Sequence, residues 1–179
     1  MNLANKLTVL RIALIPLFLA FVLSGLPYSD FVAEAIFLTA AVTDALDGYV
    51  ARKRKEITNL GKLLDPLADK LLVAAAIICL VEIGRISTWV AVVIIGREFL
   101  VTGLRGVAAT EGIVIAASKA AKFKTVIQIA ALAMLIVDDF LIGLLGFSPG
   151  VWILYLAVAL TVYSGIDYVV KTFARIKMM

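Results

Sequence analysis

Four aspartates have the residue type and the spacing to do chemistry in this chain. Asp44, Asp47, Asp65 and Asp69 lie within the stretch DALDGYVARKRKEITNLGKLLDPLADK, and the segments on both sides of it are strongly apolar. An aspartate at the centre of a membrane helix costs roughly 2.5–3.5 kcal/mol. Such acids need a compensating partner, and a bound cation is one.

Helical spacing predicts that the acids lie on two stripes. One stripe consists of Asp44, Asp47, Gly48, Ala51 and Arg52, at i, i+3, i+4, i+7 and i+8 of one helix. The other consists of Gly61, Asp65 and Asp69, at i, i+4 and i+8 of the next helix. If the stripes face each other, four carboxylates converge, and Mg²⁺ or Mn²⁺, which prefer oxygen ligands, would relieve their repulsion. Two such ions can clamp the attacking and leaving oxygens of phosphoryl chemistry.

The other members of these stripes suit a phosphate ligand. Gly48, Ala51 and Gly61 are small enough to let a bulky ligand approach the backbone. Arg52 can take a phosphate bidentately. The stripes therefore combine metal ligands with room and charge for a phosphate group.

Two other interpretations of the acids stay open on spacing alone. They could be interfacial aspartates paired with neighbouring lysines and arginines, or they could line a pathway for protons or divalent cations, because intramembrane acids are also typical of transporters. Pairing alone would not require the acids to share stripes with small residues. The chain has no histidine, and its one cysteine, Cys79, lies in an apolar run, so acid–base or metal chemistry must use carboxylates.

The elements that must position these residues are membrane helices. Of the 179 residues, 63% are hydrophobic, far above the roughly 45–50% of soluble domains. Apolar runs separated by turn residues predict six helices, at about 8–26, 31–51, 63–83, 87–109, 124–145 and 150–171. Pro66 is typical of a first helical turn, so we expect Asp65 to cap the third helix as well. The prediction is an all-α polytopic membrane protein with a single domain over residues 1–179.

The basic residues predict the orientation. Those near the helix ends on one side are Lys6, Arg11, Arg52, Lys53, Arg54, Lys55, Lys62, Arg105, Lys119, Lys122, Lys124, Lys171, Arg175 and Lys177, whereas the opposite loops contain only Arg85. The positive-inside rule then places both termini and the acidic stripes on the cytoplasmic side of the cell membrane. The net charge of +4 needs no nucleic-acid partner, because these residues lie where anionic lipid headgroups would be.

The acidic stretch resembles the signature of the CDP-alcohol phosphatidyltransferase family, D-x2-D-G-x2-A-R-x8-G-x3-D-x3-D, and every spacing is met from Asp44 to Asp69. The resemblance implies a six-helix membrane enzyme, usually a homodimer, with a divalent-metal site, Mg²⁺ or Mn²⁺, at the cytoplasmic side. Such enzymes transfer a phosphatidyl group from CDP-diacylglycerol to an alcohol and release CMP. By the same resemblance Asp44, Asp47 and Asp65 are metal ligands, and Asp69 is both a metal ligand and the general base. Contacts to CDP-diacylglycerol are implied for Asn5, Thr8, Gly48, Ala51, Arg52, Thr58 and Gly61.

Over nearly its full length the chain is most similar to family members whose acceptor is glycerol 3-phosphate. The segments that carry this similarity are NLANKLTVLRIALIPLF, GKLLDPLADKLL and GREFLVTGLRGVAATEGIVIAASKAAKFKTVIQ. Two departures are Ala4, where proline is common, and Ala121, where glycine commonly precedes the lysine. Inositol phosphate, serine or phosphatidylglycerol are the alternative acceptors, and a divalent-cation transporter is the remote alternative.

A dianionic acceptor needs cations, and five basic residues are candidates for its pocket. They are Arg97, Arg105, Lys119, Lys122 and Lys124. Arg97 and Arg105 are eight residues apart, on roughly one helix face, and Arg97 lies deepest in an apolar run. The alternative is that these side chains extend toward lipid headgroups. Glu98 follows Arg97, but adjacent helical residues point about 100° apart, so no pairing between them is assumed.

Three further aspartates lie outside this pattern. Asp138 and Asp139, near the non-cytoplasmic end of the fifth predicted helix, are expected to be solvated. Asp167 could contact a neighbouring helix or the pocket. Aromatic residues near the predicted helix ends are typical of an interfacial aromatic belt, and these are Tyr28, Trp89, Trp152 and Tyr155.

Overall fold

The computed structural model describes residues 3–54, 59–110 and 119–176, and its side chains for residues 7–43, 67–68, 70–108 and 123–172. Every element in this part of the chain is a helix. The helices are α1 (Leu3–Leu23), α2 (Ser29–Arg54), α3 (Asn59–Glu82), α4 (Thr88–Thr110), α5 (Lys119–Ile136), α6 (Asp138–Leu145) and α7 (Pro149–Ile176). The predicted all-α class is confirmed.

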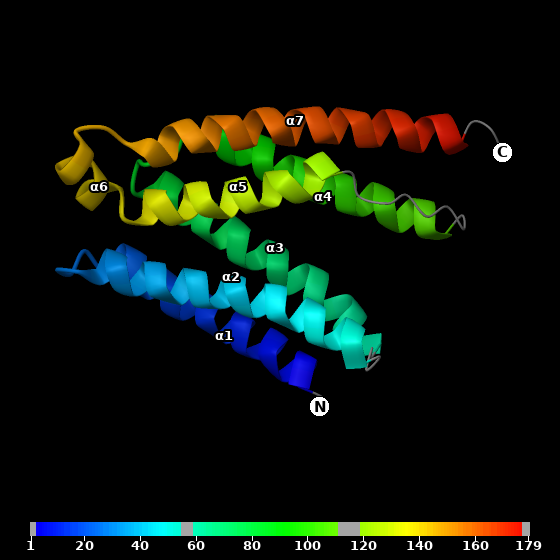
Figure 1. Ribbon diagram of the computed structural model, residues 1–179, viewed down its shortest axis with the longest axis horizontal. Helices are drawn as coiled ribbons and strands as arrows, with labels where there is room; N and C mark the ends of the chain where they lie inside the picture. Colours follow the sequence, from blue (N-terminus) through cyan, green and yellow to red (C-terminus); the bar gives the residue numbers. More distant parts are fainter. Residues whose placement is uncertain (1–2, 55–58, 111–118, 177–179) are drawn as a thin grey trace.

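The long helices form two groups, and most of them lie roughly along the long axis of the molecule, which is horizontal in Figure 1. In the first group α1 packs on both α2 and α3, and in the second α7 packs on both α4 and α5. Contacts of α5 with α2 and α3, and of α3 with α4, join the groups. The short turns and α6 lie at the left end of the view, and the two chain termini lie toward the right (Figure 1). The C-terminal part of α2 and the start of α3 are at this second end, so both acidic stripes are there as well.

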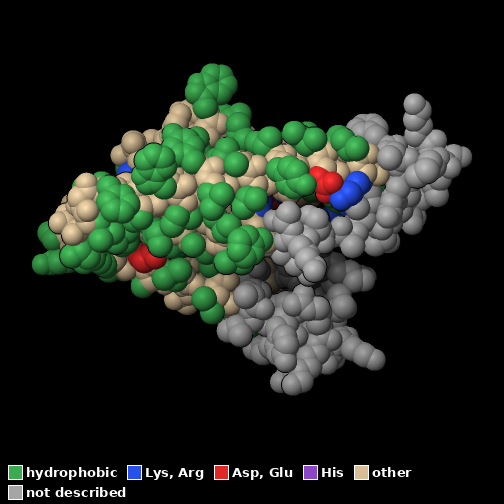
Figure 2. All heavy atoms as spheres, turned by 45° about the horizontal axis from the view of Figure 1, so that its top comes forward, with side chains coloured by type: hydrophobic (Ala, Val, Ile, Leu, Met, Phe, Trp, Pro, Cys, Tyr) green, Lys and Arg blue, Asp and Glu red, His purple; other side chains and the backbone are tan. Residues whose placement is uncertain are grey.

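The core is apolar, and so is much of the surface. Phe18 of α1 and Phe37 of α2 are fully buried, with ring centroids 5.8 Å apart. Large hydrophobic side chains are also exposed, including both tryptophans, Trp89 and Trp152, and such side chains cover most of the described face in Figure 2. A hydrophobic exterior of this extent is what a lipid environment requires, since a soluble monomer rarely exposes large contiguous apolar patches.

Among the described residues, one helix is by itself long and apolar enough to cross a membrane. It comprises Pro149–Thr172 of α7. The segments Phe123–Ile136 and Asp138–Leu145 meet the same criterion together, but they are bent by 80°. Leu7–Leu23 is an apolar but shorter helix. The number of spans therefore stays a prediction.

The predicted continuous helix 124–145 is wrong, because the chain breaks between α5 and α6. The break falls at Val137, and Asp138 and Asp139 occupy the first turn of α6. The helix α6 then ends at Gly146, whose positive φ of 78° suits glycine and whose N–H donates to the carbonyl of Ile142. Acids in a first turn interact favourably with the helix dipole, which supports a new helix start here.

Arg85, in the turn between α3 and α4, accounts for the end of α5. Its Nη1 donates to the carbonyl oxygens of Leu135 and Ile136 at 3.0 and 2.6 Å. Its Nη2 donates to Asp30 at 2.9 Å and to Asp139 at 2.6 Å. Burial alone would lower the pKa of Arg85, but its bonds to the two carboxylates outweigh burial and raise that pKa. The guanidinium thus ties α2, α5 and α6 together.

The prediction that Asp138 and Asp139 are simply solvated is wrong for Asp138, whereas the Asp139 side chain is exposed. Asp138 is buried and accepts a hydrogen bond of 2.5 Å from Ser148, and Asp139 pairs with Arg85. Asp167, which had been left open, pairs with Lys171 one turn along α7, at 2.7 Å.

The start of α3 also differs from the prediction. This helix begins at Asn59, one turn before the predicted start, so Asp65 lies inside it and is not its cap. Both acids of the second stripe are therefore on regular helix, at the spacing that the sequence requires for one face.

Candidate active site

The predicted acidic stripes lie on two helices that pack against each other. Asp44 and Asp47 are in the C-terminal half of α2, and Asp65 and Asp69 are in the N-terminal half of α3. Several predicted site side chains lie outside the described ones: those of Asn5, Asp44, Asp47, Gly48, Ala51, Arg52, Gly61, Asp65, Asp69, Lys119 and Lys122. Thr58 lies outside the described residues. The two stripes therefore lie on neighbouring helices, and the convergence of their side chains stays a prediction.

The helix α1, which packs on both α2 and α3, carries a buried arginine. Phe18 contacts Phe37 across the antiparallel pair of α1 and α2. Seven residues along each helix, which is about two turns, the corresponding positions are Arg11 and Asp44. Arg11 is only 1% exposed, and Thr8, one turn away on the same face, is equally buried. From the sequence, Arg11 was used only to predict the orientation of the chain in the membrane. Its spacing of three residues from Thr8, a predicted contact to CDP-diacylglycerol, could have indicated a role in the site.

Two of the basic residues that were predicted to bind the acceptor substrate contact α7. Arg97 donates through Nη2 to Ser164 at 2.8 Å, and its side chain passes over Gly165, where an added Cβ would be 3.0 Å from Arg97 Cγ. Arg105 lies over the ring of Tyr168, with its guanidinium carbon 5.7 Å from the ring centroid, a cation–π distance. Both arginines therefore interact with protein groups of α7.

Glu98 connects Arg97 to Lys124. Arg97 Nη1 lies 3.6 Å from Glu98 Oε1, so the neighbours that were not assumed to pair do form an ion pair. Lys124 Nζ of α5 donates to the same oxygen. Lys124 is only 2% exposed, so the alternative that it extends to lipid headgroups is wrong. No role was predicted for Glu98, although an acid inside the apolar run WVAVVIIGREFLV was the available signal.

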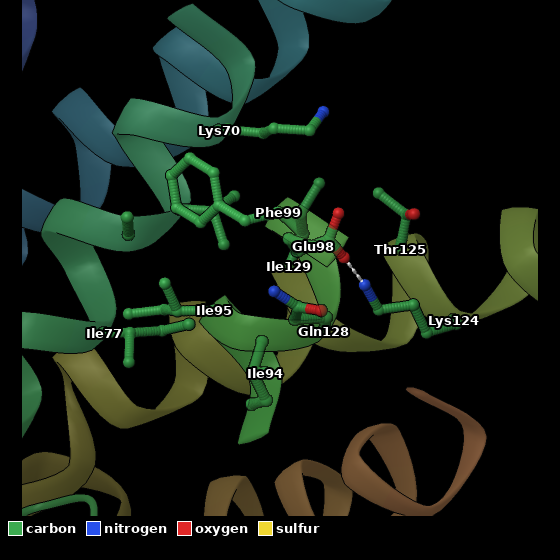
Figure 3. A pocket seen from close by; sticks show the side chains of 12 residues that line it. Lys70, Ile77, Ile94, Ile95, Glu98, Phe99, Lys124, Thr125, Gln128 and Ile129 are labelled. Carbon is green, nitrogen blue, oxygen red and sulfur yellow. Dashed lines mark hydrogen bonds and ion pairs between the residues drawn. The ribbon is translucent and has the colours of Figure 1, made fainter. Parts of the chain in front are cut away.

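Lys124 and Glu98 line a small cavity between α3, α4 and α5. Its volume is about 50 Å³. The lining residues of α3 are Lys70, Val73, Ala74 and Ile77, those of α4 are Ile94, Ile95, Glu98 and Phe99, and those of α5 are Lys124, Thr125, Gln128 and Ile129. Figure 3 shows Glu98, Lys124 and Gln128 side by side, with isoleucines beyond them. One part of the lining is thus polar and the rest is apolar.

The cavity continues the second acidic stripe. The spacing of four residues that relates Asp65 to Asp69 leads next to Val73 and then to Ile77 along α3, and both line the cavity. On a helix, residues four apart follow one another on one face. The cavity therefore lies next along the face of α3 that carries the predicted general base.

The donor set available at the stripes suits a hard divalent cation. It consists of four carboxylates on two packed helices, in a chain without histidine and with its one cysteine buried in the core. All-oxygen ligation is typical of Mg²⁺ and Mn²⁺. Among the described side chains no group of three or more potential ligands occurs, and the four aspartates are not among those side chains.

Comparisons with known proteins identify the family of the chain. Residues 1–163 match the family model described as CDP-alcohol phosphatidyltransferase, and the chain belongs to this family. The chain is 43% identical to the CDP-diacylglycerol–glycerol-3-phosphate 3-phosphatidyltransferase of Bacillus subtilis, over 98% of this chain and 97% of the relative. It is 38% identical to the protein of the same name from Rickettsia bellii, over 93% of each chain. A "Probable phosphatidylglycerophosphate synthase" of Mycobacterium tuberculosis is 40% identical over 95% of this chain and 81% of its own.

Family membership confirms the resemblance seen in the signature. The protein is a CDP-alcohol phosphatidyltransferase, and the family is membrane-associated and generally dependent on a divalent metal. The roles of individual residues stay predictions.

Proposed function

We propose that this protein transfers the phosphatidyl group of CDP-diacylglycerol to sn-glycerol 3-phosphate, giving phosphatidylglycerophosphate and CMP. The relatives that match nearly the whole chain carry this reaction in their names. The structural observation that supports it best is the face of α3, where the aspartate stripe leads into a cavity lined by Lys124 and Glu98. A site of this kind joins an anionic, metal-binding part to a part with fixed cations.

The four aspartates have two roles at the reacting phosphorus, which are metal binding and proton acceptance. Asp44, Asp47 and Asp65 hold Mg²⁺ or Mn²⁺, as two ions, and Asp69 completes the ligand set. When bound, the metal neutralises charge on the phosphates and lowers the pKa of the attacking hydroxyl. Asp69 accepts the proton of that hydroxyl, while the hydroxyl oxygen of the acceptor forms a bond to the β-phosphorus of CDP-diacylglycerol. The bond from this phosphorus to the oxygen of CMP breaks, and CMP leaves.

The remaining signature residues bind the donor substrate. Gly48, Ala51 and Gly61 leave room for the CDP group, and Arg52 binds its phosphates. The other contacts to CDP-diacylglycerol are Asn5, Thr8 and Thr58. The burial of Thr8 on α1, which packs on both α2 and α3, supports its part in this set.

Basic residues of α4 and α5 bind the phosphate of the acceptor. Lys124 is the described residue with the strongest support, because it is buried beside the stripe of α3. Arg97 joins it through Glu98, and Arg105, Lys119 and Lys122 complete the pocket. Arginine and lysine are the usual partners of phosphate.

The whole chain, residues 1–179, acts as one membrane domain. It crosses the membrane six times, with both termini and the active site in the cytoplasm, and it works as a homodimer. The exposed apolar side chains around the bundle and the concentration of lysines and arginines at one side support this placement.

The test is an acceptor panel with detergent-solubilised full-length protein. CDP-diacylglycerol, Mg²⁺ or Mn²⁺ and each acceptor in turn are supplied, and the release of CMP is measured. Glycerol 3-phosphate should release CMP fastest, ahead of inositol phosphate, serine and phosphatidylglycerol. A preference for an uncharged alcohol would contradict the assignment of Arg97 and Lys124. Uptake of divalent metal into proteoliposomes without any CMP release would instead favour a cation transporter.

A further inference from the structure

Gln128 of α5 lines the cavity, and its buried side chain leaves a hydrogen-bond acceptor unused among the described residues. Its side chain is only 3% exposed and lines the cavity next to Lys124 and Glu98, as Figure 3 shows. Its Oε1 is buried and has no hydrogen-bond partner among the described residues. Leaving such a group unsatisfied costs about 1–3 kcal/mol. An unsatisfied acceptor on a residue that lines a cavity therefore favours a ligand group that donates a hydrogen bond to it.

The chemistry of Gln128 defines what this ligand group is. An amide oxygen accepts a hydrogen bond, and the adjacent NH₂ donates. A hydroxyl group can satisfy both, because it is a donor and an acceptor. A phosphate monoester is largely dianionic at neutral pH, since its second pKa is about 6, and its oxygens then only accept. Gln128 therefore suits a hydroxyl, whereas the ammonium of Lys124 suits the phosphate of the same molecule.

The size and position of the cavity fit part of a small polyol. A volume of about 50 Å³ holds about four water molecules at roughly 10–15 Å³ each, which is room for a hydroxyl and its carbon but not for a nucleotide. The cavity follows Asp69 along the face of α3. A group in the cavity would thus be attached to an acceptor whose other hydroxyl reacts near Asp69.

We propose that Gln128 binds the hydroxyl of the acceptor that does not react, and that it selects acceptors with two hydroxyl groups. Glycerol 3-phosphate has such a second hydroxyl, at its central carbon, beside the terminal hydroxyl that attacks phosphorus. Water fills the cavity before the acceptor binds and is displaced by this hydroxyl. The inference rests on the proposed function and adds a residue that determines specificity for the acceptor.

The test compares two acceptors that differ only in this hydroxyl. Glycerol 3-phosphate and 3-hydroxypropyl phosphate, which lacks the central hydroxyl, are given to the full-length wild type and to Gln128→Met, and kcat/KM is measured from CMP release. The wild type should prefer glycerol 3-phosphate by at least about tenfold. In Gln128→Met the preference should fall to about onefold to threefold, through a loss on glycerol 3-phosphate alone. The KM for CDP-diacylglycerol should not change.

Thr161→Val is the matched control. Thr161 lies on α7, outside the cavity lining, and its hydroxyl is also buried without a hydrogen-bond partner among the described residues. Its replacement should leave the preference between the two acceptors unchanged. Gln128→Asn, which keeps the amide but withdraws it by one methylene, should give an intermediate preference and serves as the second variant if Gln128→Met does not fold.

Several outcomes would overturn the inference. Equal use of both acceptors by the wild type would do so without any variant. An equal loss on both acceptors in Gln128→Met would mean that Gln128 is only structural or binds only water. If the wild type released no CMP with glycerol 3-phosphate, the proposed function itself would fail, and the two failures are therefore distinguishable.

Discussion

Replacing Arg85 by methionine should be the most destabilising single change at the end of the bundle that carries α6. The bond to Asp30, which is partly buried, is worth about 2 kcal/mol, and the bonds to the carbonyls of Leu135 and Ile136 about 1 kcal/mol each. The bond to Asp139 adds less than about 1 kcal/mol, because the Asp139 side chain is 81% exposed. The expected loss is about 4 kcal/mol.

The single cysteine provides the assay. Cys79 is 1% exposed, so a fluorogenic maleimide reacts with it only when the helices separate, and its signal follows thermal unfolding in detergent. For a chain of this size 1 kcal/mol corresponds to roughly 2–4 °C in Tm, so Arg85→Met should lower Tm by about 10 °C. Asp139→Asn is the matched control and should lower it by no more than about 3 °C. Equal shifts for the two variants, or a shift of Arg85→Met below about 3 °C, would refute the idea that the guanidinium holds this end together.

Three further changes test other parts of the structure. Asp69→Asn should reduce CMP release by at least about 100-fold while Tm is retained, and full activity would remove Asp69 from the role of general base. Gly150→Ala should destabilise the protein by about 1–3 kcal/mol, because its Cβ would lie 2.9 Å from Leu135 Cγ and 3.1 Å from the Leu135 backbone nitrogen. Gly143→Ala, where a Cβ meets nothing within 4 Å, is its control in the thermal assay and should not lower Tm. Asp167→Asn removes an exposed pair four residues apart on α7 and should change stability by less than about 0.5 kcal/mol and leave CMP release unaltered; a large effect on either would show a role beyond this pair.

The break between α5 and α6 could not be predicted from the sequence. The apolar pattern of 124–145 continues across Val137, so periodicity alone favours one helix. The break depends on Arg85, which reaches the last carbonyls of α5 from a turn about 50 residues away in the chain. A local pattern contains no information on such a contact.

The acceptor side shows the same limit. Eight-residue spacing correctly placed Arg97 and Arg105 on related faces of α4, but it could not tell which neighbour that face meets. In the structure both arginines interact with α7, and Glu98 joins Arg97 to Lys124. No sequence pattern pointed to Gln128, because what distinguishes it is that burial leaves its oxygen without a partner among the described residues.

The sequence by itself determined the family, the all-helical class and the two acidic stripes, because residue type and helical period are local properties. Only the tertiary structure decided that the stripe of α3 leads to a cavity with Lys124, Glu98 and Gln128, and that Arg11 is buried on α1, the helix that packs against both α2 and α3. These features depend on which helix faces touch. That choice results from packing the whole bundle, where burial of apolar side chains and satisfaction of the few polar ones must be achieved together.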